Sequence, residues 1–141
     1  MKRITLLLAG GMLLLTTAAL AQEPAPKTDP LPDLISTLKT SPLLAPNKDV
    51  TVNITVANQG AAPAPESEYE IIIKNARAPR EVIRVFKKKI RALELNDKYS
   101  YSFNIKLGLG FFEICGTVDR KKKIKESDKT NNKTCLTIEG I

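Results

Sequence analysis

Two cysteines and the acidic residues between them are the side chains of this sequence best suited to chemistry. Cys115 and Cys135 enclose Asp119, Glu126 and Asp128. Two cysteines can form a disulfide or a redox couple, and clustered carboxylates can bind Ca²⁺. The 141-residue chain contains no histidine, and it carries no serine-nucleophile motif, phosphate-binding loop or Cys-based metal spacing. We therefore expect a protein that is not an enzyme and that requires no cofactor.

The residues around the two cysteines predict neighbouring antiparallel strands. In each strand the apolar residues fall on one face and the cysteine on the other, so pairing Cys115 with Cys135 also places Ile114 opposite Leu136. This register predicts a cross-strand disulfide on the outer surface of one sheet, closing a loop of about 20 residues and stabilising the fold by about 3 kcal/mol. Two free thiols are the alternative. A redox-active pair is disfavoured because the sequence lacks the Cys-X-X-Cys spacing.

The segment between these strands mixes acids and amides with lysines. One interpretation is a Ca²⁺ site at Asp119, Glu126 and Asp128. The other is that Asp and Asn side chains bond to nearby backbone groups and hold the loop, with Ile124 buried beneath it. We favour the second interpretation, because the charge of the surrounding lysines opposes a dication. These lysines are Lys121, Lys122, Lys123, Lys125 and Lys129.

Two runs of basic residues are the remaining candidate site. They comprise Lys87, Lys88, Lys89 and Arg91 in the first run, and Arg120, Lys121, Lys122 and Lys123 in the second. Lysines on an edge strand discourage aggregation of sheets, and we favour this interpretation. The alternative is an anion-binding patch, which the formal net charge of +7 suits. We expect no nucleic-acid partner, because the chain lacks tryptophan and no aromatic residues are interleaved with these lysines.

Seven segments have the alternation or the β-branched composition of strands. They are residues 34–39, 50–56, 68–74, 82–90, 99–107, 111–119 and 133–139. Residues 82–90 also fit helical spacing, but their β-branched content favours a strand. Seven short strands separated by turns predict an all-β protein, a seven-stranded antiparallel immunoglobulin-like β-sandwich.

The loop and three shorter segments resemble a known family. The pattern Ile-x-Glu-Ser-Asp-x-Thr-Asn-Asn at 124–132, with Pro32-Asp33-Leu34, Asn58-Gln59-Gly60 and Gly110-Phe111-Phe112, is similar to the CARDB family, the cell-adhesion-related domain found in bacteria. The resemblance implies an immunoglobulin-like sandwich in exported or surface proteins, with a binding or adhesion role. It also implies a structural role for the loop motif, which consists of Asp119, Ile124, Glu126, Ser127, Asp128, Asn131 and Asn132.

The chain departs from this family pattern at a few positions. Lys122 stands where asparagine is common, and Asn96-Asp97 stands where glycine is usual. The cysteine pair is not part of the general pattern.

The N-terminal residues predict export. Lys2 and Arg3 precede an apolar run that is too short for a confident membrane span, and Ala19-Leu20-Ala21 has the small residues that a signal peptidase requires. We expect a cleaved bacterial signal peptide at 1–21, a proline-rich leader at 22–32 and the sandwich domain at 33–141. A retained anchor is the alternative. After cleavage we expect no transmembrane segment, and a periplasmic or secreted location.

These observations favour an exported, non-catalytic binding or adhesion module that contacts a protein or an anionic cell-surface polymer. A structural or accessory envelope protein without a ligand is one alternative, and a calcium-dependent adhesive domain is another.

Overall fold

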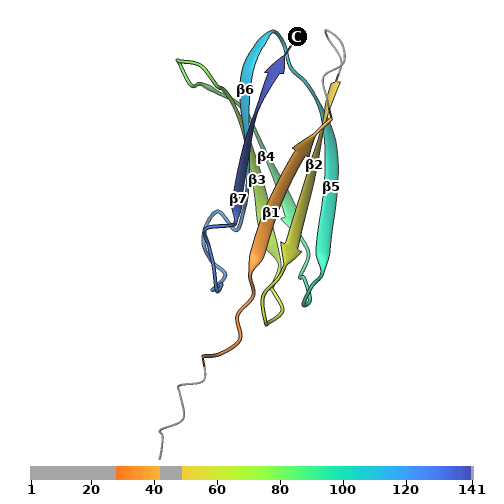
Figure 1. Cartoon of the computed structure of the whole chain (residues 1–141), viewed down its shortest axis with the longest axis vertical. Helices are drawn as coiled ribbons and strands as arrows, with labels where there is room; N and C mark the ends of the chain where they lie inside the picture. The colour runs from red at the N-terminus through yellow and green to blue at the C-terminus, as the bar shows by residue number, and fades with distance from the viewer. Residues whose placement is uncertain (1–27, 42–48, 141) are drawn as a thin grey trace, which may run out of the picture.

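The computed structural model describes residues 28–41 and 49–140 as two β-sheets packed face to face (Figure 1). The predicted all-β sandwich of seven strands is confirmed. The strands are β1 (Leu34–Thr40), β2 (Asp49–Asn58), β3 (Ser67–Asn75), β4 (Val82–Ile90), β5 (Lys98–Lys106), β6 (Gly110–Val118) and β7 (Lys133–Gly140). The predicted signal peptide, the leader up to residue 27 and Ile141 lie outside the described residues. Within the described ranges, nothing forms a helix long and apolar enough to cross a membrane.

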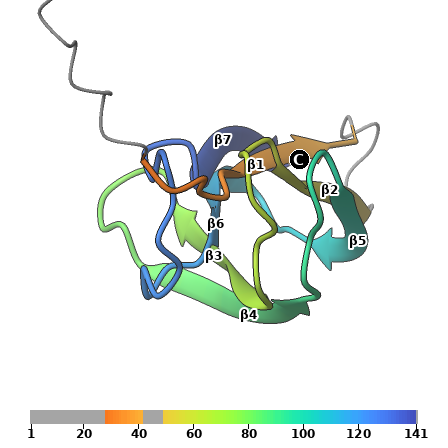
Figure 2. The ribbon, with the colours of Figure 1, turned by 90° about the horizontal axis from the view of Figure 1, so that it is seen from below.

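Both sheets are antiparallel and open at their edges. One has three strands in the order β1-β2-β5, and the other has four in the order β4-β3-β6-β7. Seen along the strands, the two sheets form separate layers with β1 next to β7 (Figure 2). β4 pairs only with β3 and is therefore an edge strand, as expected for a lysine-rich segment.

The ambiguous segment at 82–90 is a strand, as predicted. Its helix-like spacing arises because apolar residues lie on both faces of β4. Phe86 packs against the core, whereas Val82 and Val85 are exposed. A strand with apolar residues on both faces loses the period of two that normally identifies it.

The core fills the space between the sheets with alternating side chains from both. In β2 every second residue is buried, namely Val50, Val52, Ile54 and Val56. In β3 the inward residues are Tyr69, Ile71 and Ile73. Strands of this kind, with one buried and one solvated face, produce the alternation that is visible in the sequence.

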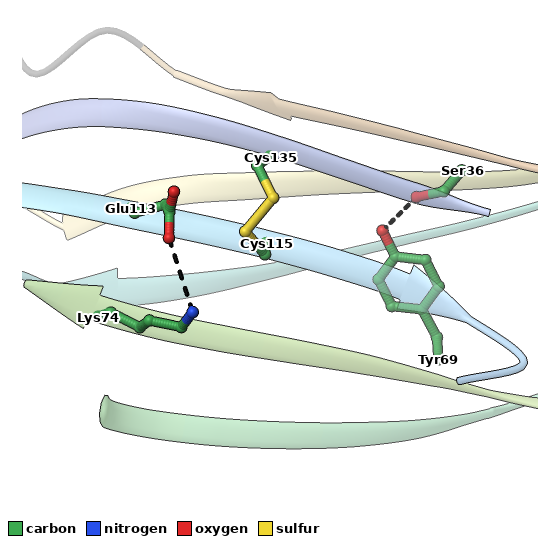
Figure 3. The surroundings of a disulfide bond; sticks show 6 residues. All are labelled: Ser36, Tyr69, Lys74, Glu113, Cys115 and Cys135. Carbon is green, nitrogen blue, oxygen red and sulfur yellow. Dashed lines mark hydrogen bonds and ion pairs between the residues drawn. A yellow bond between two sulfur atoms is a disulfide. The ribbon is translucent and has the colours of Figure 1, made fainter. Parts of the chain in front are cut away.

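Tyr69 connects the two layers through its hydroxyl group (Figure 3). The phenol oxygen lies 2.7 Å from Oγ of Ser36 on β1, and burial raises the pKa of Tyr69 above its ordinary value. Gly116 on β6 lies directly beside this oxygen, and a Cβ atom there would overlap it. A glycine is therefore required at 116, since any side chain would displace the tyrosine from its bond to Ser36.

Candidate functional site

The two cysteines are joined by a disulfide across β6 and β7 (Figure 3). The predicted register is confirmed, because Cys115 pairs with Cys135 and Ile114 pairs with Leu136. The two Cα atoms are 4.1 Å apart. The bond lies on the outer face of the four-stranded sheet, as predicted. Its Cys115 end is nevertheless only 5% exposed, because Cys115 lies between Cys135 on β7 and Ile72 on β3.

The strand pairings extend this contact into rows across the outer face of the four-stranded sheet. The row of the disulfide is apolar and contains Val85, Ile72, Cys115 and Cys135. The row beside it is polar and contains Lys87, Glu70, Thr117 and Lys133. On the other side of the disulfide, Lys74 forms an ion pair with Glu113 at 3.7 Å. This outer face, with an apolar row between charged rows, is called the basic face below.

Asp119 shapes the beginning of the loop between β6 and β7. Its carboxylate accepts hydrogen bonds from the backbone N–H groups of Lys123 and Ile124, at 3.0 and 2.9 Å. Ile124 is buried in the core cluster, as expected. Asp119 and Lys122 both have positive φ angles, of 44° and 52°. The turn therefore has the left-handed conformation at Lys122, the position where asparagine is common in the family pattern.

The second half of the loop is attached to the beginning of β1. Glu126 is buried, and its two oxygens accept hydrogen bonds from the backbone of Leu34 and from Nδ2 of Asn132, both at 2.8 Å. Burial raises the pKa of Glu126, although both hydrogen bonds act in the opposite direction. Asn131 donates to Asp33 at 2.8 Å. The backbone N–H of Ser127 donates to the carbonyl of Pro32, which fixes the loop against the other sheet.

The three candidate calcium ligands point to different partners. Asp119 and Glu126 accept the bonds described above, and Asp128 accepts from the backbone and hydroxyl of Thr130, which lowers the pKa of Asp128. Among residues 28–41 and 49–140, no group of three or more acidic or cysteine side chains is arranged to hold a metal ion. Local hydrogen bonding of the loop accounts for the residue types of the motif.

The structure brings part of the two basic runs together and separates the rest. Glu70 lies between them on the basic face, 3.7 Å from Nζ of Lys87 and in an ion pair with Arg120. Lys88 instead turns inward over the ring of Tyr101, and Arg91 is paired with Asp97 at 2.5 Å. The eight predicted residues therefore do not form one patch.

A hollow of about 450 Å³ lies beside this junction, between the basic face and the β6–β7 loop. Its lining includes Ile72, Cys115, Thr117 and Thr130. Five of its twelve lining residues are cations and one is an acid, Asp119. The cations are Lys74, Arg120, Lys122, Lys129 and Lys133.

Three of these five cations were missed by reasoning from sequence. Lys133 could have been found, because the register that pairs the cysteines also places Lys133 opposite Thr117. The position of Lys129 in the sequence indicates only a charge that opposes calcium. Lys74 could not have been found, because its position depends on the pairing of β3 with β6, which residues far apart in the sequence determine.

Comparison with known proteins identifies relatives of the domain. The family model for CARDB matches residues 31–135, whereas no curated protein sequence matches the chain. The crystal structure of the CARDB domain of the PF1109 protein from Pyrococcus furiosus, in complex with di-metal ions, is similar with a TM-score of 0.65 and 20% identity, covering 79% of this chain and 90% of that one. A solution structure of a domain from a Methanosarcina acetivorans protein, provisionally described as a cell-surface protein, has a TM-score of 0.58 and 18% identity, covering 79% and 93% of the two chains.

Proposed function

The chain belongs to the CARDB family, and we propose that it is an exported, non-catalytic binding module that contacts an anionic surface polymer or protein through its basic face. The family is associated with cell-adhesion-related roles. The observation that carries the proposal is the meeting of two basic runs on one face, at Glu70, although they are far apart in the sequence.

The outer face of the three-stranded sheet differs in a way that supports this choice. Its polar side chains are mostly neutral and bond to each other across strands, as in the pairs Thr51–Asn104, Thr55–Ser100 and Ser102–Asn53. Hydroxyl and amide groups that are already paired offer little to a charged partner. The basic face borders the hollow, whose lining has five cations and one acid, so we place the contact there.

Two further observations support export, and a third explains why the proposal includes no metal ion. Disulfides persist mainly in oxidising compartments outside the cytosol, and Cys115 and Cys135 form one. The relative from Methanosarcina is described provisionally as a cell-surface protein. The Pyrococcus domain was solved with metal ions, but the carboxylates of this loop accept hydrogen bonds from the loop itself and from β1.

A heparin column tests the proposed contact. We expect the oxidised protein to be retained at low salt and released as salt is added, because exposed charges are screened within about 10 Å at 0.1 M salt. The double substitution Lys87→Ser with Lys89→Ser should lower the salt required for elution. The matched control is Lys39→Ser with Lys106→Ser, which removes the same charge from exposed positions on the three-stranded sheet.

The outcomes separate a specific face from general attraction. A larger shift for the basic-face variant than for the control supports the proposal. Equal shifts would show that only net charge matters, and a protein that is not retained at low salt would contradict anion binding altogether.

A further inference from the structure

The hollow beside the β6–β7 loop holds positive charge that the protein itself does not neutralise. Lys74 is paired with Glu113, and Arg120 is paired with Glu70. Within the described residues, Lys122, Lys129 and Lys133 have no ion-pair partner. Asp119, the one acid in the lining, can offset only one of these three charges. Like charges gathered around a concavity create a local positive potential that attracts an anion.

The loop backbone holds these lysines in place. Lys122 has a φ of 52°, a conformation that costs a residue other than glycine about 1–2 kcal/mol. The ammonium group of Lys129 donates to the carbonyl of Lys122 at 3.3 Å, so the two lysines are linked across the loop. Backbone that is held in an unfavourable conformation often marks a functional position. Here the conformation presents a lysine to the hollow.

The apolar residues that the sheet contributes to the lining of the hollow lie next to the disulfide. Ile72 and Cys115 belong to the apolar row of the basic face, and the bond to Cys135 joins β6 to β7 at that point. Thr117 and Thr130 add hydroxyl groups to the lining, and the hydroxyl of Thr130, which donates to Asp128, can still accept a hydrogen bond. A volume of about 450 Å³ is within the range of roughly 300–1,000 Å³ for small-molecule sites. The lining of the hollow thus combines apolar side chains, hydroxyl groups and cations.

We propose that this hollow is a discrete binding site for one anionic group carried on a sugar-sized body, with Lys122, Lys129 and Lys133 contacting the anion. The proposal rests on the proposed function, since it assigns part of the anionic partner to a defined site. The body of the ligand lies on Ile72 and the disulfide, and its hydroxyl groups face Thr117 and Thr130. An acidic saccharide unit of a surface polymer has this chemistry.

Titration of the ¹⁵N-labelled, oxidised protein with sodium glucuronate, followed by NMR at constant ionic strength, tests the proposal. We expect saturable shifts of the amide signals of Thr117, Lys122, Thr130 and Lys133. Glucose should produce no such shifts, because it lacks the charge. Inorganic sulfate distinguishes the sources of the anion: weaker binding than glucuronate indicates that the sugar body contributes, and equal binding indicates that the anionic group alone is recognised.

Lys122→Asn is the most informative variant. It removes a cation and also places at 122 a residue that adopts positive φ more easily, so weaker binding cannot result from a destabilised loop. We expect the dissociation constant for glucuronate to rise about fivefold, consistent with about 1 kcal/mol for one charge at 4 Å in water. The control is Lys39→Ser on the other sheet, which should bind like the wild type.

Three results would overturn the site: shifts that do not saturate, equal binding of glucose, or equal weakening by Lys122→Asn and Lys39→Ser. The column experiment remains independent of these results. Heparin retention that depends on Lys87 and Lys89, without saturable glucuronate binding, would contradict the hollow and leave the basic face as the contact surface. Saturable glucuronate binding without heparin retention would contradict the proposed function and leave the hollow as a site for small anions.

Discussion

The β6–β7 loop, residues 119–132, uses its acidic and its basic residues in opposite ways. Asp119 and Glu126 are buried, and each accepts two hydrogen bonds from within the domain. Lys121, Lys122 and Lys123 are exposed and have no ion-pair partner among the described residues. A carboxylate can accept several N–H groups, including those of the backbone, whereas an ammonium group is costly to bury without an anion. The acids therefore build the loop, and the lysines are available to a partner.

This difference changes how the family motif is understood. Its acidic residues resemble a calcium-binding sequence when only their types and their order in the sequence are considered. In the structure, Asp119 organises the first turn and Glu126 attaches the loop to β1. The residues that remain free for binding are lysines between and around the motif positions. Substitutions on the two sides of the loop should consequently affect different properties, stability on the acidic side and binding on the basic side.

The largest expected loss of stability is that of Ile124→Ala. Ile124 belongs to the core cluster and is 7% exposed, so truncation removes buried apolar contacts and leaves a cavity. We expect the free energy of unfolding to fall by about 3 kcal/mol, as measured by denaturant titration. Lys123→Ala, one position earlier and exposed, should change it by less than about 0.5 kcal/mol. Similar losses for the two variants would show that the loop is not divided into a buried and a free side.

Asp119→Ala should have the second-largest effect. The carboxylate accepts from two backbone N–H groups, and its removal leaves the buried N–H of Ile124 without a partner. We expect a loss of about 2 kcal/mol. Asp128→Ala is the matched control, because Asp128 also accepts two hydrogen bonds but is exposed. If the control lost as much stability as Asp119→Ala, burial would not be what distinguishes the structural acids.

The sequence predicted the hairpin in detail because two independent signals agreed there. Apolar alternation and the two cysteines required the same register, and the structure has this register. The strands themselves were also predictable, including β4, from β-branched composition and turns. A loop held by its own Asp and Asn side chains followed from local chemistry, since these bonds join residues close in sequence.

The proposed binding surface could not be predicted in the same way, because it depends on which strands become neighbours. Lys87 and Arg120 share Glu70 only because β3 lies between β4 and β6. Lys88 is a candidate for the alternative, an anion-binding patch, but its alternation along β4 turns it towards Tyr101. Arg91 lies beyond the end of β4 and bonds with Asp97. A run of like charges in the sequence therefore does not reveal which charges are already paired.

The smallest expected effect concerns the dependence of stability on pH at Glu126. Burial raises the pKa of this carboxyl group, Asp119 acts in the same direction, and Asn132, Leu34 and Lys129 oppose it. Because the folded state then binds the proton more tightly than the unfolded state, the contribution of Glu126 is greatest below the ordinary glutamate pKa. It declines as pH rises from that value through the pKa of the folded state.

Glu126→Gln should remove this decline, because glutamine does not titrate. Its amide oxygen can still accept from Leu34, and Asn132 can turn its side-chain amide to present Oδ1, which has no partner in the wild type. Thermal melts between about pH 4.5 and 7 would measure the slope of stability against pH.

Asp97 and Asp128 do not interfere, since the pKa values of both are lowered and their contributions are lost only at more acidic pH. Glu81→Gln, at an exposed position, should retain the wild-type slope. Equal slopes for wild type and Glu126→Gln would mean that the buried carboxylate is fully compensated by its hydrogen bonds, and the acidic side of the loop would then be insensitive to pH.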